Sequence, residues 1–333
     1  MNKIKIIATL GPSTFKKKIL NELKKNIDIF RLNMSHLTIK QLNQKLILLK
    51  KNNINNICID TEGAQIRTIF KKKKLYKKNT FFKITSNKFK GKNLIQFYPT
   101  FSFSNIKINT KVSIGFSGLK AIVIKKNKNY LLCKVVSEGY LEPNKGVHFD
   151  TNIDLKPLTD KDYAAIKLAK KFKIKIFALS FANSSKDVKL LKSILHKNDT
   201  LISKIETRKG FENRKKITKL SNAILIDRGD LSRFITISKI PLAQRIIMND
   251  AKKINKKVYI ATNLLETMIH SNEPTRAESN DIFSSLESGC KGLVLAAETA
   301  IGKNPLKCVE FLKECLQIFN NKKKYLLNNN KFF

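Results

Sequence analysis

The sequence predicts an α/β protein, a (β/α)8 TIM barrel with a small all-β domain inserted after the third strand. Two observations predict it. Short apolar, β-branched runs alternate with segments of helical period, and eight such pairs follow one another along the chain. The alternation is interrupted once, by strand-like pieces without a helical pattern. Alternating strands and helices are typical of a parallel sheet covered by helices, and eight pairs can close into a barrel.

The eight expected barrel strands are short, apolar runs, which is typical of strands buried on both faces. They span residues 5–10, 27–33, 56–60, 174–180, 201–205, 223–227, 258–262 and 292–296. The expected helices span residues 14–25, 38–52, 160–172, 185–197, 207–220, 242–255, 276–289 and 305–319. Capping residues Asp160 and Ser184, and Pro305 at the start of the last helix, support these assignments.

The interruption predicts the inserted domain. Its strand-like pieces include FFKITS, KVSIG, LKAIVI and YLLCKVV. We therefore expect residues 1–68 to form the first part of the barrel, 69–150 an inserted β lid domain, and 151–333 the second part of the barrel.

The composition favours a cytoplasmic protein. No apolar run reaches the roughly 18 residues that a membrane-spanning helix needs, and the first residues lack the pattern of a signal peptide. The five cysteines are scattered without a CxxC pair, so neither a zinc site nor a disulfide framework is expected.

The formal net charge is +41, from 66 Lys and Arg against 25 Asp and Glu. Basic proteins attract nucleic acids. However, 58 of the 66 are lysines, and they are spread among abundant Asn and Ile over the whole chain. A nucleic-acid groove more often uses Arg with interleaved aromatic residues. The distribution favours a compositional bias and argues against a nucleic-acid partner.

Polar residues gather at the carboxyl ends of six of the eight expected strands. In a (β/α)8 barrel, catalytic residues come from these ends. Each residue alone has an ordinary explanation as a surface cation, a loop residue or a helix cap. Their common position favours an active site. They are Arg31, Asn33, Ser35 and His36 after the second strand, Asp60, Thr61 and Arg67 after the third, Lys204 and Glu206 at the fifth, Arg228, Gly229 and Asp230 after the sixth, Thr262 at the seventh, and Glu298 and Thr299 after the eighth.

These residue types limit the chemistry. Glu206 and Asp230 are carboxylates that, together with substrate oxygens, suit Mg²⁺ or Mn²⁺. Arg31, Arg67 and Lys204 are cations that can bind and neutralise a phosphoryl group during transfer.

A carboxylate can bind near Gly229, which starts a turn or short helix with outward N–H groups. No glycine-rich phosphate loop is readable, so scattered cations would hold a nucleotide. No Ser-His-Asp arrangement is readable, and four histidines leave little for a three-histidine metal site. The residues predict a divalent-metal enzyme for a phosphorylated, carboxylate-bearing small molecule.

Eight segments resemble the pyruvate kinase family, in its order and close to its spacing. They are ATLGPST, FRLNMSH, IDTEGAQIRT, SKIET, DRGDL, ATNLLETMI, PTRAES and AETA. The resemblance implies Mg²⁺-dependent phosphoryl transfer from phosphoenolpyruvate to ADP, which gives pyruvate and ATP as the final step of glycolysis. It also implies a homo-oligomer, in which two barrels meet at PTRAE, residues 274–278.

The resemblance also implies residue roles. Lys204, Thr262 and Arg31 would be catalytic. Gly229 and Asp230 would join these three in binding the substrate. The remaining roles are Glu206 and Asp230 as Mg²⁺ or Mn²⁺ ligands, Asn33, Ser35, Asp60 and Thr61 as a K⁺ site, and Pro12, His36, Arg67 and Lys145 as the nucleotide site.

Two departures bear on regulation and on potassium. The usual family member continues with a C-terminal domain that binds allosteric effectors, whereas this sequence stops at residue 333. We therefore expect an enzyme that lacks this domain and effector regulation. Gln65 stands where the family generally has Glu, or Lys in a branch that does not need potassium, so the K⁺ requirement stays open.

Two other hypotheses stay open. One is a catalytically weakened pyruvate-kinase-like protein that acts as a basic RNA-binding protein, which predicts salt-sensitive RNA binding. The other is a metal-dependent aldolase or lyase that acts on pyruvate without a nucleotide. Arg31, Arg67 and Lys145 argue against the latter, because it has no nucleotide phosphates to neutralise.

Overall fold

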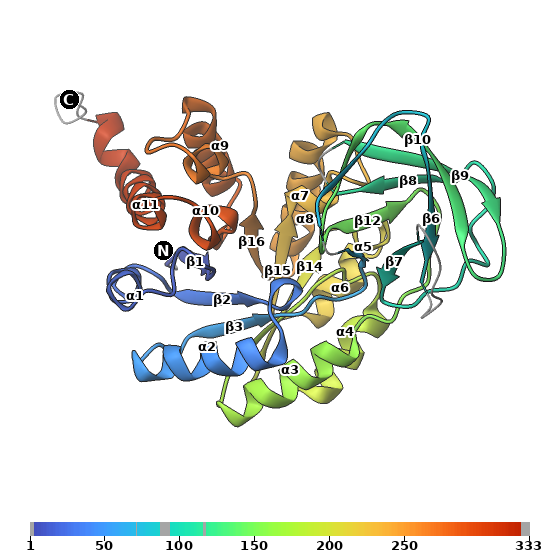
Figure 1. Ribbon diagram of the computed structural model, residues 1–333. Coiled ribbons are helices and arrows are strands. Elements are labelled where there is room, and N and C mark those ends of the chain that lie inside the picture. Colours follow the sequence, from blue (N-terminus) through green and yellow to red (C-terminus); the bar gives the residue numbers. More distant parts are fainter. Residues whose placement is uncertain (1–2, 71, 87–93, 116–117, 328–333) are drawn as a thin grey trace. The chain divides into compact units, whose positions relative to one another are not determined.

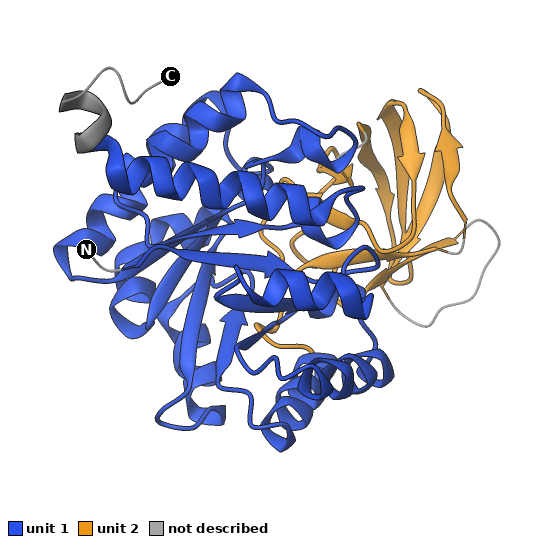
Figure 2. Ribbon diagram, turned by 90° about the vertical axis from the view of Figure 1, so that its left-hand side faces the viewer, with its two compact units in different colours: residues 1–62, 160–333 blue, residues 63–159 orange. Residues whose placement is uncertain are grey.

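The computed structural model describes residues 3–70, 72–86, 94–115 and 118–327 (Figure 1). The chain divides into two compact units (Figure 2). Unit 1 comprises residues 1–62 and 160–333, and unit 2 comprises residues 63–159. Among the described residues, no helix is long and apolar enough to cross a membrane.

Unit 1 contains a closed barrel of eight parallel strands (Figure 1). In chain order the strands are β1 (Lys5–Thr9), β2 (Ile29–Asn33), β3 (Ile57–Asp60), β13 (Ile176–Leu179), β14 (Thr200–Ile205), β15 (Ala223–Asp227), β16 (Lys257–Ala261) and β17 (Gly292–Leu295). Each pairs with its neighbour in this order, and β1 also pairs with β17 to close the barrel. The fold class predicted from the sequence is confirmed.

Helices alternate with these strands. The longer ones are α1 (Lys17–Lys24), α2 (Ile39–Lys51), α3 (Asp160–Lys171), α4 (Ser185–Ile194), α5 (Arg208–Glu212), α6 (Arg214–Leu220), α8 (Ile240–Lys253), α9 (Arg276–Glu287) and α11 (Pro305–Leu327). Short turns of helix are α7 (Arg228–Leu231), α10 (Ala297–Ala300), η1 (Met34–His36), η2 (Ile237–Lys239) and η3 (Glu266–Ile269).

One expected helix, residues 207–220, is two helices in the structure. Asn213 separates α5 from α6 with a non-helical backbone. Its side-chain amide donates to the carbonyl oxygen of Asn183 at 2.9 Å. The break is thus held by a contact with a segment 30 residues away in the chain.

The interior of the barrel is apolar over most of its length. On β14, side chains alternate between the two faces, so Ile202, Lys204 and Glu206 share one side. Ile202 belongs to the interior cluster, which places the two charged residues at its carboxyl end. The cluster comprises Ile7, Ile29, Cys58, Ala178, Ile202, Ala223, Leu225, Tyr259, Ala261 and Val294.

Unit 2 contains a second, smaller closed barrel of seven strands and a separate two-stranded sheet. The barrel strands are β4 (Ile66–Ile69), β6 (Phe81–Thr85), β7 (Leu94–Tyr98), β8 (Lys111–Ile114), β9 (Leu119–Lys126), β10 (Leu131–Ser137) and β12 (Gly146–Phe149), and the two-stranded sheet pairs β5 (Lys74–Tyr76) with β11 (Gly139–Leu141). Because β4 pairs with β7 and β12, the second sheet begins before residue 69.

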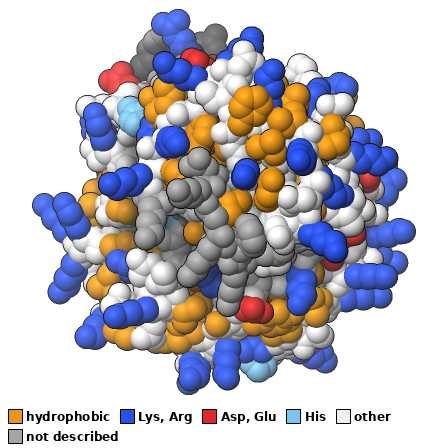
Figure 3. Space-filling model, turned by 45° about the vertical axis from the view of Figure 1, so that its right-hand side comes forward, with side chains coloured by type: hydrophobic (Ala, Val, Ile, Leu, Met, Phe, Trp, Pro, Cys, Tyr) orange, Lys and Arg blue, Asp and Glu red, His pale blue; other side chains and the backbone are white. Residues whose placement is uncertain are grey.

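Lysines are distributed widely over the surface. Figure 3 shows Lys and Arg side chains over much of one face, separated by uncharged and hydrophobic side chains.

We expect Ser184→Ala to lower the free energy of unfolding by about 1 kcal/mol, because Ser184 caps α4. Its Oγ accepts from the N–H of Asp187, and the Asp187 carboxylate accepts from the N–H groups of Asn183 and Ser184, both at 2.8 Å. Urea denaturation measures the effect. Ser193→Ala is the control, since Ser193 is exposed and, among the described residues, its hydroxyl donates only to the Leu190 carbonyl of the same helix. Equal losses in the two variants would contradict the capping role.

Candidate active site

The carboxyl end of the barrel brings together charged side chains from separate strands. Arg31 lies on β2, Asp60 ends β3, Lys204 lies near the end of β14, and Asp227 ends β15. Parallel strands in a closed barrel all end on the same rim. Residues that are up to 196 positions apart in sequence therefore meet here.

Lys204 is at the centre of this group and is 4% exposed. Its Nζ lies 3.1 Å from Glu206 Oε2, 3.4 Å from Asp227 Oδ2 and 3.5 Å from Asp60 Oδ2. It also donates to Ser180 Oγ at 3.2 Å. Burial by itself would lower the pKa of Lys204, but the three carboxylates outweigh it and raise that pKa. The ammonium is therefore charged at neutral pH.

Arg31 forms the second buried cation of the site. Its Nε donates to Asp60 Oδ2 at 2.8 Å, and its Nη1 donates to Thr9 Oγ1 at 2.7 Å. Burial by itself would raise the pKa of Asp60, but Lys204 and Arg31 outweigh it and hold that pKa below its usual value. Asp60 is thus an ionised bridge between the two cations.

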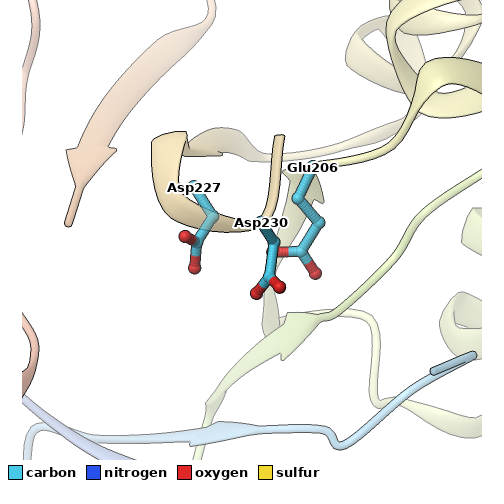
Figure 4. Close-up of side chains that lie close together, drawn as sticks. All are labelled: Glu206, Asp227 and Asp230. Carbon is cyan, nitrogen blue, oxygen red and sulfur yellow. The ribbon is translucent and has the colours of Figure 1, made fainter. Parts of the chain in front are cut away.

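Three carboxylates form a cluster beside Lys204. Glu206, Asp227 and Asp230 each offer an oxygen, and these oxygens lie within 4.8 Å of one another. Figure 4 shows the three side chains pointing toward a common space. Glu206 Oε1 accepts the backbone N–H of Phe181 at 2.6 Å, whereas its buried Oε2 has no hydrogen bond among the described residues. Burial, opposed by Lys204 and reinforced by Asp227, Asp230 and Asp60, raises the pKa of Glu206 to about 8.

This cluster fits a divalent cation. Its donors are all carboxylate oxygens, which hard cations such as Mg²⁺ and Mn²⁺ prefer. Lys204 is shared among Asp60, Glu206 and Asp227, while Arg31 pairs with Asp60 and Arg233 pairs with Asp230, so the carboxylates outnumber these cations by four to three. A buried carboxylate oxygen without a hydrogen bond costs free energy unless an ion or a donor meets it. Glu206 Oε2 makes no hydrogen bond among the described residues, but Lys204 Nζ lies 3.1 Å from it, so a bound metal would be its second cationic partner.

Thr262 lies beside the cluster, directly after β16. Its Oγ1 accepts the N–H of Gly229 at 2.8 Å and donates to the carbonyl oxygen of Ala261 at 2.6 Å. Its own carbonyl oxygen accepts two N–H groups of Arg228, whose guanidinium also pairs with Asp281 of α9 at 2.6 Å. These bonds hold Thr262 in a backbone conformation with φ of 69°. The structure thus brings Thr262 and Gly229 into contact.

The residues expected to bind K⁺ lie at the ends of β2 and β3. Asn33 and Asp60 are neighbours in the register of the two strands. Asn33 Oδ1 accepts the N–H of Ser35 at 3.0 Å, and Thr61 Oγ1 accepts the N–H of Ser180 at 3.0 Å. All four lie at this rim of unit 1, with Asp60 engaged by the two cations.

The residues expected to bind the nucleotide are divided between the two units. Pro12 and His36 are exposed residues of unit 1, in the segments after β1 and β2. Arg67 lies on β4 and Lys145 lies directly before β12, so both belong to unit 2. Lys145 Nζ is 3.3 Å from Glu142 Oε2. The structure does not bring these four together within one unit.

Two residues of the site were not selected from the sequence. Asp227 ends β15 two positions after Leu225, which lines the barrel. Because side chains two positions apart on a strand share a face, the sequence could have predicted that Asp227 also faces the barrel interior. Ser180 follows β13 and contacts both Asp60 and Lys204. It carries no comparable signal, because serine is common in loops. Glu298 instead binds the backbone N–H groups of Leu265 and Ala296.

The comparisons with known proteins agree on one family. The family model described as "Pyruvate kinase, barrel domain" matches residues 1–309. The pyruvate kinase of Methanocaldococcus jannaschii is 34% identical over 96% of this chain and 70% of that protein. The pyruvate kinase of Thermotoga maritima is 31% identical over 94% of this chain and 70% of that protein. The pyruvate kinase of Borreliella burgdorferi is 28% identical over 99% of this chain and 71% of that protein.

Proposed function

The chain belongs to the pyruvate kinase family, and from this premise we propose that it transfers the phosphoryl group of phosphoenolpyruvate to ADP. The products are pyruvate and ATP. The observation that carries the proposal is the buried ammonium of Lys204 beside the cluster of Glu206, Asp227 and Asp230. A phosphoryl-transfer site needs this combination of a fixed cation and a place for a divalent metal.

Glu206 and Asp230, assisted by Asp227, are the proposed ligands of Mg²⁺ or Mn²⁺. When bound, the metal would act as a Lewis acid that holds substrate oxygens and neutralises their charge. The burial of these carboxylates supports this role, because Glu206 is fully buried and Asp227 is 5% exposed. Charge interactions are stronger in such an environment than in water.

Lys204 is proposed to neutralise the phosphoryl group in flight and the enolate that it leaves behind. Its ammonium is held from several sides and is charged without needing to change its protonation state. A donor that is already oriented costs little reorganisation during the reaction. Arg31, fixed by Asp60 and Thr9, is proposed to bind the phosphate of the substrate.

The substrate carboxylate is proposed to bind at Gly229 and Asp230. A Cβ at position 229 would lie 3.4 Å from Thr262 Oγ1, an ordinary van der Waals contact, which places this backbone directly beside Thr262. The N–H of Gly229 bonds to Thr262 Oγ1 in this structure, so a bound carboxylate would take over that donor. The Thr262 hydroxyl would then be placed to assist protonation of the enolate.

The remaining assignments are further parts of the proposal. Asn33, Ser35, Asp60 and Thr61 would bind K⁺, and Pro12, His36, Arg67 and Lys145 would contact ADP or ATP. The segment 274–278, where Thr275 and Glu278 cap α9, would join two copies of the chain. Such an enzyme would work in glycolysis in the cytoplasm.

We expect the purified protein to form pyruvate from phosphoenolpyruvate only when ADP and a divalent metal are both present. A lactate dehydrogenase-coupled assay measures this, and parallel runs with and without KCl decide the potassium requirement. Removal of the metal with EDTA should stop turnover, and excess Mg²⁺ should restore it. A folded protein that stays silent under all of these conditions would overturn the proposal, and steeply salt-dependent RNA binding would then favour the RNA-binding hypothesis.

A further inference from the structure

The turn after β13 contains a residue in an uncommon backbone conformation. Phe181 has φ of 53° and is 4% exposed. A bulky residue with positive φ is a genuine outlier, and such a conformation costs on the order of 1–3 kcal/mol. It persists only where the surrounding structure over-determines it, which is most common at functional sites.

The peptide group between Ser180 and Phe181 faces Glu206. The N–H of Phe181 donates to Glu206 Oε1 at 2.6 Å. This hydrogen bond occupies Oε1, and Oε2 lies 3.1 Å from Lys204 Nζ. Among the described residues, Oε2 has no hydrogen bond. The hydrogen bond therefore helps to fix the orientation of the Glu206 carboxylate, which contributes an oxygen to the cluster with Asp227 and Asp230.

The turn is fixed on both sides of this peptide group. On one side, the N–H of Ser180 donates to Thr61 Oγ1 at 3.0 Å. On the other side, the chain must enter α4, whose first turn is closed by Ser184 and Asp187. The positive φ of Phe181 directs the chain from the fixed peptide group toward that helix. The positive φ of Phe181 thus occurs where its N–H donates to Glu206 and the chain turns toward α4.

We propose that Phe181 is a positioning residue for the metal site, acting through its backbone N–H on Glu206. The proposal rests on the proposed metal-binding role of Glu206. Hydrogen bonds to a ligating carboxylate orient it, and their loss typically weakens metal affinity 10- to 100-fold. The Phe181 side chain is not required for this action, whereas its N–H is.

The test measures the affinity for Mn²⁺ alone, by electron paramagnetic resonance titration of the free ion. Incorporating the α-hydroxy acid analogue of phenylalanine at position 181 replaces the amide by an ester, which removes this N–H group, keeps the side chain and makes the Ser180 carbonyl a weaker acceptor. We expect the ester at 181 to weaken Mn²⁺ binding about 10- to 100-fold. The matched control is an ester at position 183, which removes the hydrogen bond to Asp187 two residues further along the same turn and should leave Mn²⁺ affinity within about threefold of wild type.

The variant Phe181→Gly distinguishes the role of the backbone N–H from that of the side chain. Glycine adopts positive φ readily and keeps the N–H, so Mn²⁺ affinity should stay within about threefold of wild type even if thermal stability falls. Equal affinities of wild type and the 181 ester would overturn the inference, as would a loss in Phe181→Gly that matches the ester. Wild-type protein without Mn²⁺ affinity would also overturn it. Mn²⁺ binding with this pattern but without pyruvate formation would leave the inference standing and refute the proposed function.

Discussion

Lys204→Met is expected to lower kcat for pyruvate formation by about 10³-fold or more, the upper range for removing one fixed electrostatic donor from an active site. The substitution deletes the only buried ammonium within 3.5 Å of Asp60, Glu206 and Asp227 in the described part of the chain. No water-exposed lysine can replace it, because the gain depends on a charge held in a low-dielectric site. Initial rates at saturating phosphoenolpyruvate, ADP and Mg²⁺ measure the effect.

The control for this substitution is Lys256→Met. Lys256 Nζ donates to the carbonyl oxygen of Ser221 at 2.7 Å, away from the cluster. Lys256 is partly buried directly before β16, at the amino end of the barrel, so its replacement should leave kcat within about twofold. A kcat in Lys204→Met equal to that of Lys256→Met would refute the role proposed for Lys204.

Folding of Lys204→Met needs its own measurement, because the variant leaves buried carboxylates without their cation. Breaking a buried ion pair by removing one partner costs about 3–5 kcal/mol. Thermal unfolding followed by circular dichroism shows whether the variant is folded at the assay temperature. Lys204→Arg keeps the charge but changes its geometry. We expect it to fold better than Lys204→Met and still to lose most of its activity.

The barrel could be predicted because its strands and helices carry independent local signals. Strands such as β15 and β17 are buried on both faces and read as continuous apolar runs. Helices such as α4 begin at a serine that caps them. These signals depend on neighbours in sequence, which a single sequence displays.

The features of the structure that the sequence did not predict depend on contacts between distant segments of the chain. The break between α5 and α6 is fixed by the bond from Asn213 to the Asn183 carbonyl. Ser180 gains its role only because β3 and β14 place Asp60 and Lys204 on either side of it. No local pattern contains this information.

The candidate site could be predicted in position but only in part in its composition. Barrel enzymes use the carboxyl ends of their strands for catalysis. From this rule we predicted Arg31, Asp60, Lys204 and Glu206 as site residues, and the structure joins them in one network of ion pairs. The third carboxylate of the cluster, Asp227, looks in sequence like the residue before a short helix. Its closeness to Lys204 follows from the pairing of β14 with β15.

Asp60→Asn is expected to lower the free energy of unfolding by about 3–5 kcal/mol, because it leaves two buried cations, Arg31 and Lys204, without their shared partner. Asp250→Asn is a matched control. Asp250 also accepts from an arginine Nε at 2.8 Å, but its pair with Arg214 is partly exposed. Its loss should cost about 1 kcal/mol or less. Urea denaturation at pH 7 compares the two variants, and equal losses would contradict the role of Asp60.

The pH dependence of stability gives the same prediction an independent check. The pKa of Asp60 is held below its usual value in the folded protein by Lys204 and Arg31, which outweigh the opposing effect of burial. A carboxyl group with a lowered folded pKa stabilises the fold above its unfolded pKa of about 3.9, and this contribution is lost as the pH falls through the folded value. Wild-type stability should therefore fall more steeply below about pH 4 than that of Asp60→Asn, which has no proton to bind at this position. Parallel acid-unfolding curves would show that Asp60 is not the ionised bridge between the two cations.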